Sequence, residues 1–74
     1  MNATAGTIGI TLNDRPHALP APATLQGLLA HAGLAERKGI AAAVNGEVVP
    51  RAAWASRPLA ARDRVLVIRA TQGG

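Results

Sequence analysis

The chain has 74 residues, which is room for one domain around one small hydrophobic core. It contains no cysteine, which excludes a disulfide framework and a thiolate metal site and favours a reducing, cytoplasmic location. The formal net charge of +4 raises nucleic acid as a partner, but a single Trp is the only aromatic residue. Binders of single strands need several aromatic platforms among their positive charges, so nucleic-acid binding is not expected.

Nearly half of the residues are hydrophobic, at 49%, and most of them are small or aliphatic. Such a core buries little area per residue and leaves no space for a deep substrate cleft, so we do not expect an enzyme with a site of its own. No segment approaches the roughly 20 consecutive apolar residues that span a bilayer, and no membrane contact is expected. Residues 1–6 are expected to form a flexible arm ahead of one domain over residues 7–70.

The first expected element is a hairpin. Residues 7–12 alternate between apolar and small or polar side chains, which is typical of a half-buried strand. Asn13 and Asp14 then predict a tight turn, and residues 15–19 predict a short return strand. Because Pro16 cannot donate a hydrogen bond to a neighbouring strand, this return strand should lie at the edge of its sheet.

A helix is expected after an extended connector over residues 20–23. Thr24 is a suitable N-cap, because its hydroxyl can accept a hydrogen bond from a free N–H group of the first turn. Apolar residues recur at helical spacing from Leu25 to Ala32, and Gly33 suits the left-handed position that follows a helix. We interpret His31 in the last turn, and His17 on the return strand, as structural or solvent-facing residues.

The second half of the chain predicts another hairpin and a long last strand. Residues 40–44 and 47–49 are separated by Asn45-Gly46, the strongest short-range hairpin signal. Residues 51–55 follow Pro50 and predict a single helical turn, with Trp54 packed at the edge of the core. Residues 64–69 are apolar on both faces, which favours the centre of a sheet and predicts the most buried strand of the chain.

The order of these elements predicts an α+β fold of the β-grasp type. A mixed sheet of four to five strands packs on one main helix, and the last strand is central. Residues 71–74 then form a flexible tail that ends in Gly73-Gly74 beyond the sheet. A glycine pair has no side chains to obstruct entry into a narrow channel of another protein. The terminal carboxylate is a poor electrophile, and the chain has neither a phosphate-binding loop nor a magnesium-binding acidic cluster, so a partner would have to activate it.

Three parts of the chain carry a family pattern: the segment from Val44 to Arg51, Trp54 three positions after it, and the last strand with its terminal Gly-Gly. Together they resemble the ThiS family of the ubiquitin-like β-grasp superfamily. This resemblance runs from about Ile8 to the end of the chain. The chain departs from the family pattern at Ala61-Arg62-Asp63, where the family has Asp-Gly-Asp. The resemblance implies a sulfur carrier of thiamine biosynthesis, which is a protein co-substrate and not a catalyst.

The resemblance also implies the site and the partners. Gly74 would be adenylated with ATP at the active site of a ThiF-like adenylyltransferase and converted to a thiocarboxylate, while Gly73 and Gln72 lie in the partner's channel. Sulfur would come through a cysteine desulfurase and pass to a ThiG-like thiazole synthase. No tightly bound cofactor or metal is implied. Arg51 and Trp54 have two interpretations, a docking surface or a structural pair, and the structural interpretation is favoured.

Three alternatives stay open at this point. A MoaD-like sulfur carrier of molybdopterin synthesis would share the fold and the tail. A ubiquitin-like modifier would be joined to lysines of other proteins after the same activation. A basic binding module would use the charge of +4, with the glycine pair incidental.

Overall fold

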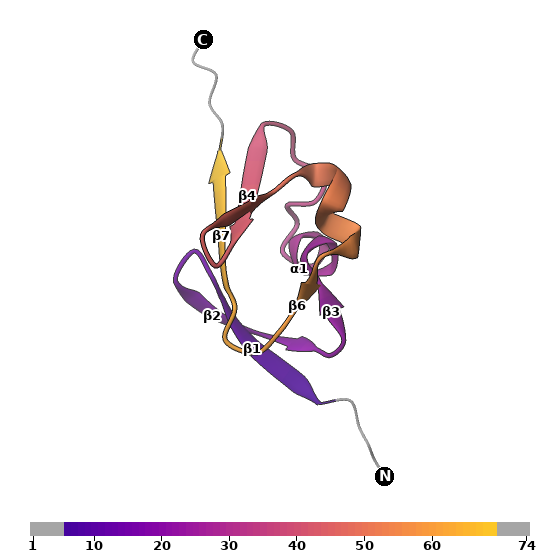
Figure 1. Cartoon of the computed structure of the whole chain (residues 1–74), viewed down its shortest axis with the longest axis vertical. Helices are drawn as coiled ribbons and strands as arrows, with labels where there is room; N and C mark the ends of the chain where they lie inside the picture. The colour runs from indigo at the N-terminus through magenta and orange to yellow at the C-terminus, as the bar shows by residue number, and fades with distance from the viewer. Residues whose placement is uncertain (1–5, 70–74) are drawn as a thin grey trace.

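The structure is a computed structural model that describes residues 6–69. The elements follow the predicted order, and two short strands are added to them. They are β1 (Thr7–Leu12), β2 (Arg15–Pro20), β3 (Ala23–Thr24), α1 (Leu25–His31), β4 (Ile40–Val44), β5 (Glu47–Val49), the 3₁₀ helix η1 (Arg51–Ser56), β6 (Pro58–Leu59) and β7 (Arg64–Arg69). Five strands form a sheet in the order β2-β1-β7-β4-β5, and β3 pairs with β6 (Figure 1). The predicted mixed sheet on one helix is confirmed.

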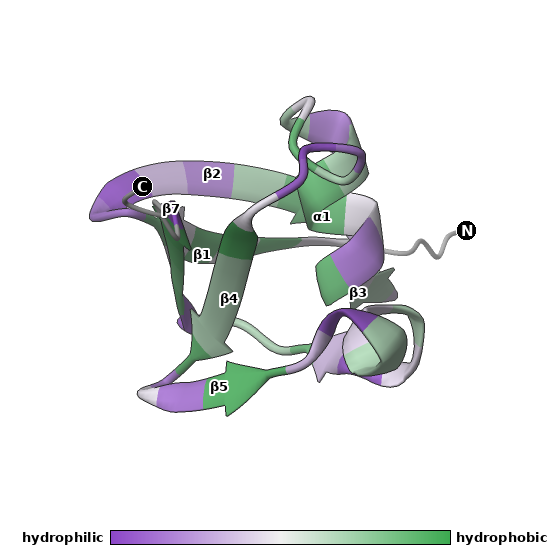
Figure 2. Cartoon of the chain, turned by 90° about the horizontal axis from the view of Figure 1, so that it is seen from above, coloured by the Kyte–Doolittle hydropathy of each residue, from purple (hydrophilic) through white to green (hydrophobic). Residues whose placement is uncertain are grey.

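The sheet curves around the side on which α1 lies, as seen from above in Figure 2. Its inner face and the helix share one core, to which η1 and β6 also contribute. All three buried leucines of α1, Leu25, Leu28 and Leu29, have no exposed surface. Within residues 6–69, no helix covers the outer face of the sheet. The domain therefore has two layers, with one face of the sheet left open.

The first hairpin has the predicted pairing and turn. Ile10 and Leu12 are buried, whereas Thr11 between them faces outward. Asn13 and Asp14 both have positive φ, of 52° and 68°, as a two-residue type I′ turn requires. β2 lies at one edge of the sheet, which confirms the prediction from its proline.

The helix begins and ends as predicted. The Thr24 hydroxyl accepts a hydrogen bond from the Gly27 N–H at 3.1 Å, and Gly33 has a φ of +77° just past the helix. The preceding connector differs from the prediction, because Ala23 and Thr24 pair with Leu59 and Pro58 to form a small second sheet. Pairs of two residues carry no periodic signal, so the sequence pattern alone could not predict this sheet.

The second hairpin is also confirmed, with Asn45 at φ 53° and Gly46 at φ 86° in its turn. The helical turn predicted over residues 51–55 is present as η1, one residue longer.

The last strand has the predicted position but not the predicted burial. β7 lies at the centre of the sheet, parallel to β1 and antiparallel to β4. Only Val65 is buried, however, while Leu66 and Ile68 are 40% and 57% exposed. The most buried strand is β4, with three consecutive buried residues. The prediction was wrong because a strand that is apolar on both faces is buried on both only where a second layer covers the sheet.

Candidate functional site

The candidate site is the end of β7 and the part of the sheet that surrounds it. β7 runs along the centre of the sheet and ends at Arg69, near the top of the coloured part of the molecule in Figure 1. The predicted site residues Gln72, Gly73 and Gly74 lie outside the described residues. What the structure describes is the strand that precedes them and the surface beside it.

Two asparagines from the two hairpin turns hold β7 in place. Asn13 Oδ1 accepts a hydrogen bond from the Val67 N–H at 2.8 Å, and Asn45 Oδ1 accepts one from the Arg64 N–H at 2.9 Å. Sequence analysis identified both only as turn residues, because their contacts with β7 arise from tertiary structure. Asparagine side chains in turns often accept hydrogen bonds from nearby backbone N–H groups. Their presence in two turns next to a central strand is the one signal that could have pointed to these contacts with β7.

Asp63 completes this network at the start of β7. Its Oδ1 accepts a hydrogen bond from Asn45 Nδ2 at 3.0 Å, and its Oδ2 accepts one from the Ala60 N–H at 2.8 Å. The turn before β7 is thus tied to the turn of the second hairpin. The beginning of the strand is fixed on both sides, which gives the end of the strand a defined direction.

Among the strands of residues 6–69, the end of β7 has a neighbour on one side only. β1 pairs with β7 through Thr11 and Leu12 alone, opposite Arg64 and Val65. β4 pairs with β7 along the whole of β4, opposite the residues of β7 from Val65 to Arg69. Figure 1 shows the upper half of β7 beside β4, with the first hairpin lower down. The last residues of β7 therefore extend beyond β1 along an open edge.

The outer face beside this edge is apolar and exposed. Leu66, Ala43 and Val48 lie opposite one another on three adjacent strands, so their side chains share this face. Val48 is 68% exposed, and Ile68 extends the row toward the end of β7. We call Val48, Leu66 and Ile68 the outer apolar patch. Exposed apolar side chains that gather on one face are typical of a protein interaction site.

Arg51 and Trp54 occupy structural positions. The Trp54 ring is 1% exposed, and its Nε1–H donates a hydrogen bond to the Val49 carbonyl at 2.9 Å. The Arg51 guanidinium donates to the carbonyl oxygens of Ala35 and Arg37 in the loop after α1. These contacts account for both residues within the fold. A docking role for the exposed part of Arg51 stays a prediction.

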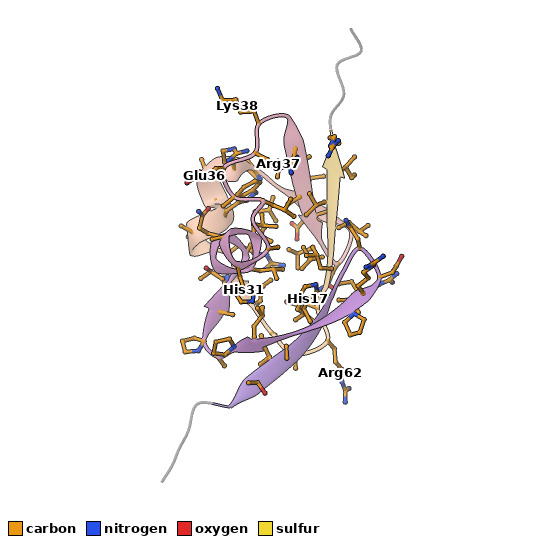
Figure 3. All side chains as sticks on the ribbon, turned by 180° about the vertical axis from the view of Figure 1, so that it is seen from behind. His17, His31, Glu36, Arg37, Lys38 and Arg62 are labelled. Carbon is orange, nitrogen blue, oxygen red and sulfur yellow. The ribbon has the colours of Figure 1, made fainter. Side chains whose placement is uncertain are left out.

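The histidines do not form a common site. His17 is half-buried on β2, His31 is exposed on α1, and Figure 3 shows them on these separate elements. Residues 6–69 contain no group of three or more His, Cys, Asp or Glu residues placed to hold a metal ion. Over the same range, no helix is both long and apolar enough to cross a membrane.

Comparisons with known proteins agree with this geometry. The model of the ThiS family matches residues 10–74, which is most of the chain. The crystal structure of the thiamine biosynthesis protein ThiS from Geobacter metallireducens superimposes with a TM-score of 0.77 at 23% sequence identity, and the match covers 90% of this chain and 100% of that one. This likeness confirms the ubiquitin-like β-grasp fold. The comparison with curated proteins gave no significant match.

Proposed function

The chain belongs to the ThiS family, whose members are small sulfur carriers of thiamine biosynthesis, and we propose that it carries sulfur on its C-terminal Gly74. The observation that carries this proposal is the family match, which continues through the central strand to the Gly-Gly end. The architecture supports it, because β7 is anchored at its start and open along one edge toward its end. The role is that of a protein co-substrate, and the catalytic groups belong to its partners.

Activation is the first step of the proposed cycle. The Gly74 carboxylate resists nucleophilic attack, because oxide is a poor leaving group. An adenylyltransferase joins the carboxylate oxygen to the α-phosphorus of ATP and releases pyrophosphate, which gives an acyl adenylate with AMP as the leaving group. ATP is therefore used at the partner's active site, and no cofactor is proposed to bind tightly to this chain.

Sulfur transfer follows from that intermediate. The terminal sulfur of a persulfide, supplied through a cysteine desulfurase, attacks the acyl carbon and displaces AMP. The resulting acyl disulfide joins the Gly74 acyl group to the donor cysteine. A thiol then attacks the sulfur of that cysteine and breaks the S–S bond, which leaves the thiocarboxylate on Gly74 and a disulfide on the donor. The thiocarboxylate is a soft nucleophile that delivers its sulfur to a thiazole synthase, and the plain carboxylate returns. We place this cycle in the cytoplasm.

The outer apolar patch supports a role in docking. An enzyme that draws the C-terminal residues into its active site comes close to the end of β7, where Ile68 and Leu66 are exposed. Covering such side chains removes apolar surface from water, which contributes roughly 25 cal/mol for each Å². The patch can therefore supply part of the affinity for a partner that binds the tail.

Intact mass spectrometry tests the proposal directly. The protein is incubated with its cognate adenylyltransferase, ATP, cysteine and a cysteine desulfurase. We expect a mass gain equal to the difference between sulfur and oxygen, and none in a variant that lacks Gly74. A variant that lacks Ala3, at the other end of the chain, is the matched control and should gain the same mass as the wild type. If an adenylyltransferase with demonstrated activity produces neither adenylate nor thiocarboxylate, the proposal fails.

A further inference from the structure

A hollow lies on the outer side of the first hairpin, next to the start of β7. Its volume is about 610 Å³. Residues of β1 and β2 line it together with Arg62 and Arg64, and apart from Ile10 and His17 their side chains are small or short. A Cβ atom added at Gly9 would meet nothing within 4 Å, so the missing side chain there leaves open space. None of the described residues that line the hollow is acidic.

Arg62 stands at this hollow in an unfavourable backbone conformation. Its φ is +74°, in the left-handed region that suits glycine and asparagine and strains a long side chain. Its N–H donates a hydrogen bond of 2.6 Å to the Gly9 carbonyl, which ties this turn to β1. Figure 3 shows the Arg62 side chain extending outward from the body of the domain. A strained residue whose side chain is exposed is typical of a functional position.

The acidic residue next to Arg62 in the sequence, Asp63, already has hydrogen-bond partners for its carboxylate. Both carboxylate oxygens of Asp63 accept hydrogen bonds, from the Asn45 side chain and from the Ala60 N–H. Asp63 is thereby committed to the turn that precedes β7. The hollow thus has two arginines at its border, walls made mostly of small side chains, and a side open to solvent, a combination that suits a carboxylate on a short side chain.

We propose that this hollow receives an Asp or Glu side chain of the adenylating enzyme, with Arg62 and Arg64 as the residues that select it. This inference rests on the proposed function. Adenylation must bring the anionic C-terminus up to the anionic phosphates of ATP, which repel it. Binding energy gained at a remote contact can offset that repulsion, and a basic hollow at the far end of β7 from the tail is such a contact.

The geometry of β7 also fixes where the acidic residue must lie. Arg64, Leu66 and Ile68 are successive outward positions of one strand, so the hollow, the outer apolar patch and the end of β7 form one strip. At about 3.3 Å per residue, Arg64 and Ile68 are roughly 13 Å apart. The enzyme should therefore carry an acidic side chain about that far from the apolar surface at the mouth of its channel.

The test is the dissociation constant of the complex with the purified cognate adenylyltransferase, measured by calorimetry at low salt. Arg62→Asn removes the charge and keeps a residue that tolerates positive φ, whereas Arg62→Lys keeps the charge. We expect about fivefold weaker binding for Arg62→Asn and a change of less than about twofold for Arg62→Lys. The difference should shrink at high salt, because exposed charges are screened.

The matched control is Arg57→Asn, which removes one positive charge at the end of η1, on the helix side of the domain and away from the outer face of the sheet. It should leave the dissociation constant within about twofold of the wild type. Equal weakening by Arg57→Asn and Arg62→Asn would show that only the net charge of the domain matters and would overturn the inference. So would unchanged binding of Arg62→Asn.

The intact-mass experiment distinguishes a failure of this inference from a failure of the proposed sulfur-carrier function. Wild-type protein that gains sulfur, together with unchanged affinity of Arg62→Asn, would reject the hollow and leave the carrier function intact. Thermal unfolding of Arg62→Asn guards against misfolding. The variant should melt at or above the wild-type temperature, because asparagine relieves strain at this φ.

Discussion

The guanidinium carbon of Arg51 lies 4.5 Å from the centroid of the Trp54 ring. The same guanidinium donates hydrogen bonds to two carbonyls of the loop that follows α1. The indole N–H in turn reaches the Val49 carbonyl at the end of β5. One arginine and one tryptophan thus connect η1 to the loop after the helix and to the second hairpin.

Replacing Arg51 should lower stability without abolishing the fold. Arg51→Ala removes two hydrogen bonds and the cation–π contact, and we expect a loss of roughly 1–3 kcal/mol in the free energy of unfolding. Arg51→Lys should fall between this variant and the wild type, since a single ammonium group cannot reach both carbonyls in the same fork geometry. Urea denaturation measures both. Arg15→Ala, at an exposed position of β2, is the control and should change stability by less than about 0.5 kcal/mol.

Trp54 should be sensitive to the loss of a single polar atom. Trp54→Phe keeps most of the buried area but leaves the Val49 carbonyl without its indole donor, and we expect a loss of about 1–2 kcal/mol. Trp54→Ala should cost about 3–5 kcal/mol, which equals the whole net stability expected for so small a core, and leave the chain unfolded. Far-ultraviolet circular dichroism follows unfolding in both variants. A Trp54→Phe variant as stable as the wild type would show that the hydrogen bond contributes nothing net.

Local signals carried most of the fold prediction. The Asn13-Asp14 and Asn45-Gly46 turns, the Thr24 cap and the apolar spacing of α1 are all set by residues within a few positions of each other. Such signals act before any tertiary contact forms, so a single sequence reveals them. The edge position of β2 followed in the same way, from one proline that cannot donate to a neighbouring strand.

Tertiary relationships accounted for what the sequence pattern missed. An apolar strand does not reveal whether a second layer covers it, and the burial of Leu66 and Ile68 was therefore overestimated. The contacts of Asn13 and Asn45 with β7 join residues that are distant in sequence. The Gly73-Gly74 end was singled out by its place after the last strand, but its role as a sulfur carrier came only from the family resemblance, because two terminal glycines alone have no specific chemical meaning.

The outer apolar patch should matter for binding and not for stability. Ile68→Ser changes an exposed side chain, so the unfolding midpoint should move little, while affinity for the adenylyltransferase should fall about tenfold through lost apolar contact. Ile10→Ser makes the same chemical change at a residue that is 2% exposed on the inner face, and there the domain should lose most of its stability. Titration calorimetry and thermal unfolding compare the two variants. Undiminished affinity of Ile68→Ser would remove the patch from the interface.

Gly73 should tolerate no side chain in the activation step. In Gly73→Ala, the added methyl group should obstruct the channel ahead of Gly74, and misplacement of the carboxylate should slow adenylation about a hundredfold. Gly6→Ala is the matched control, because a Cβ there meets nothing within 4 Å. Release of pyrophosphate in the presence of the adenylyltransferase gives the rate. Equal rates for the two variants would show that the channel has room for a side chain at Gly73.

Asn13 should protect one backbone amide of the central strand. Its Oδ1 is the acceptor for the Val67 N–H, at the point where pairing of β7 with β1 has ended. Asn13→Gly keeps the left-handed turn at no steric cost but removes the acceptor, whereas Asn13→Asp keeps both. Hydrogen exchange followed by NMR should show the Val67 amide exchanging about tenfold faster in Asn13→Gly and near the wild-type rate in Asn13→Asp, since one hydrogen bond contributes about 1 kcal/mol. The amide of Leu66, which faces β4, should keep its protection in both variants and serves as the internal reference. A Val67 amide that is equally protected in all three proteins would show that the open edge of β7 is closed by something other than this side chain.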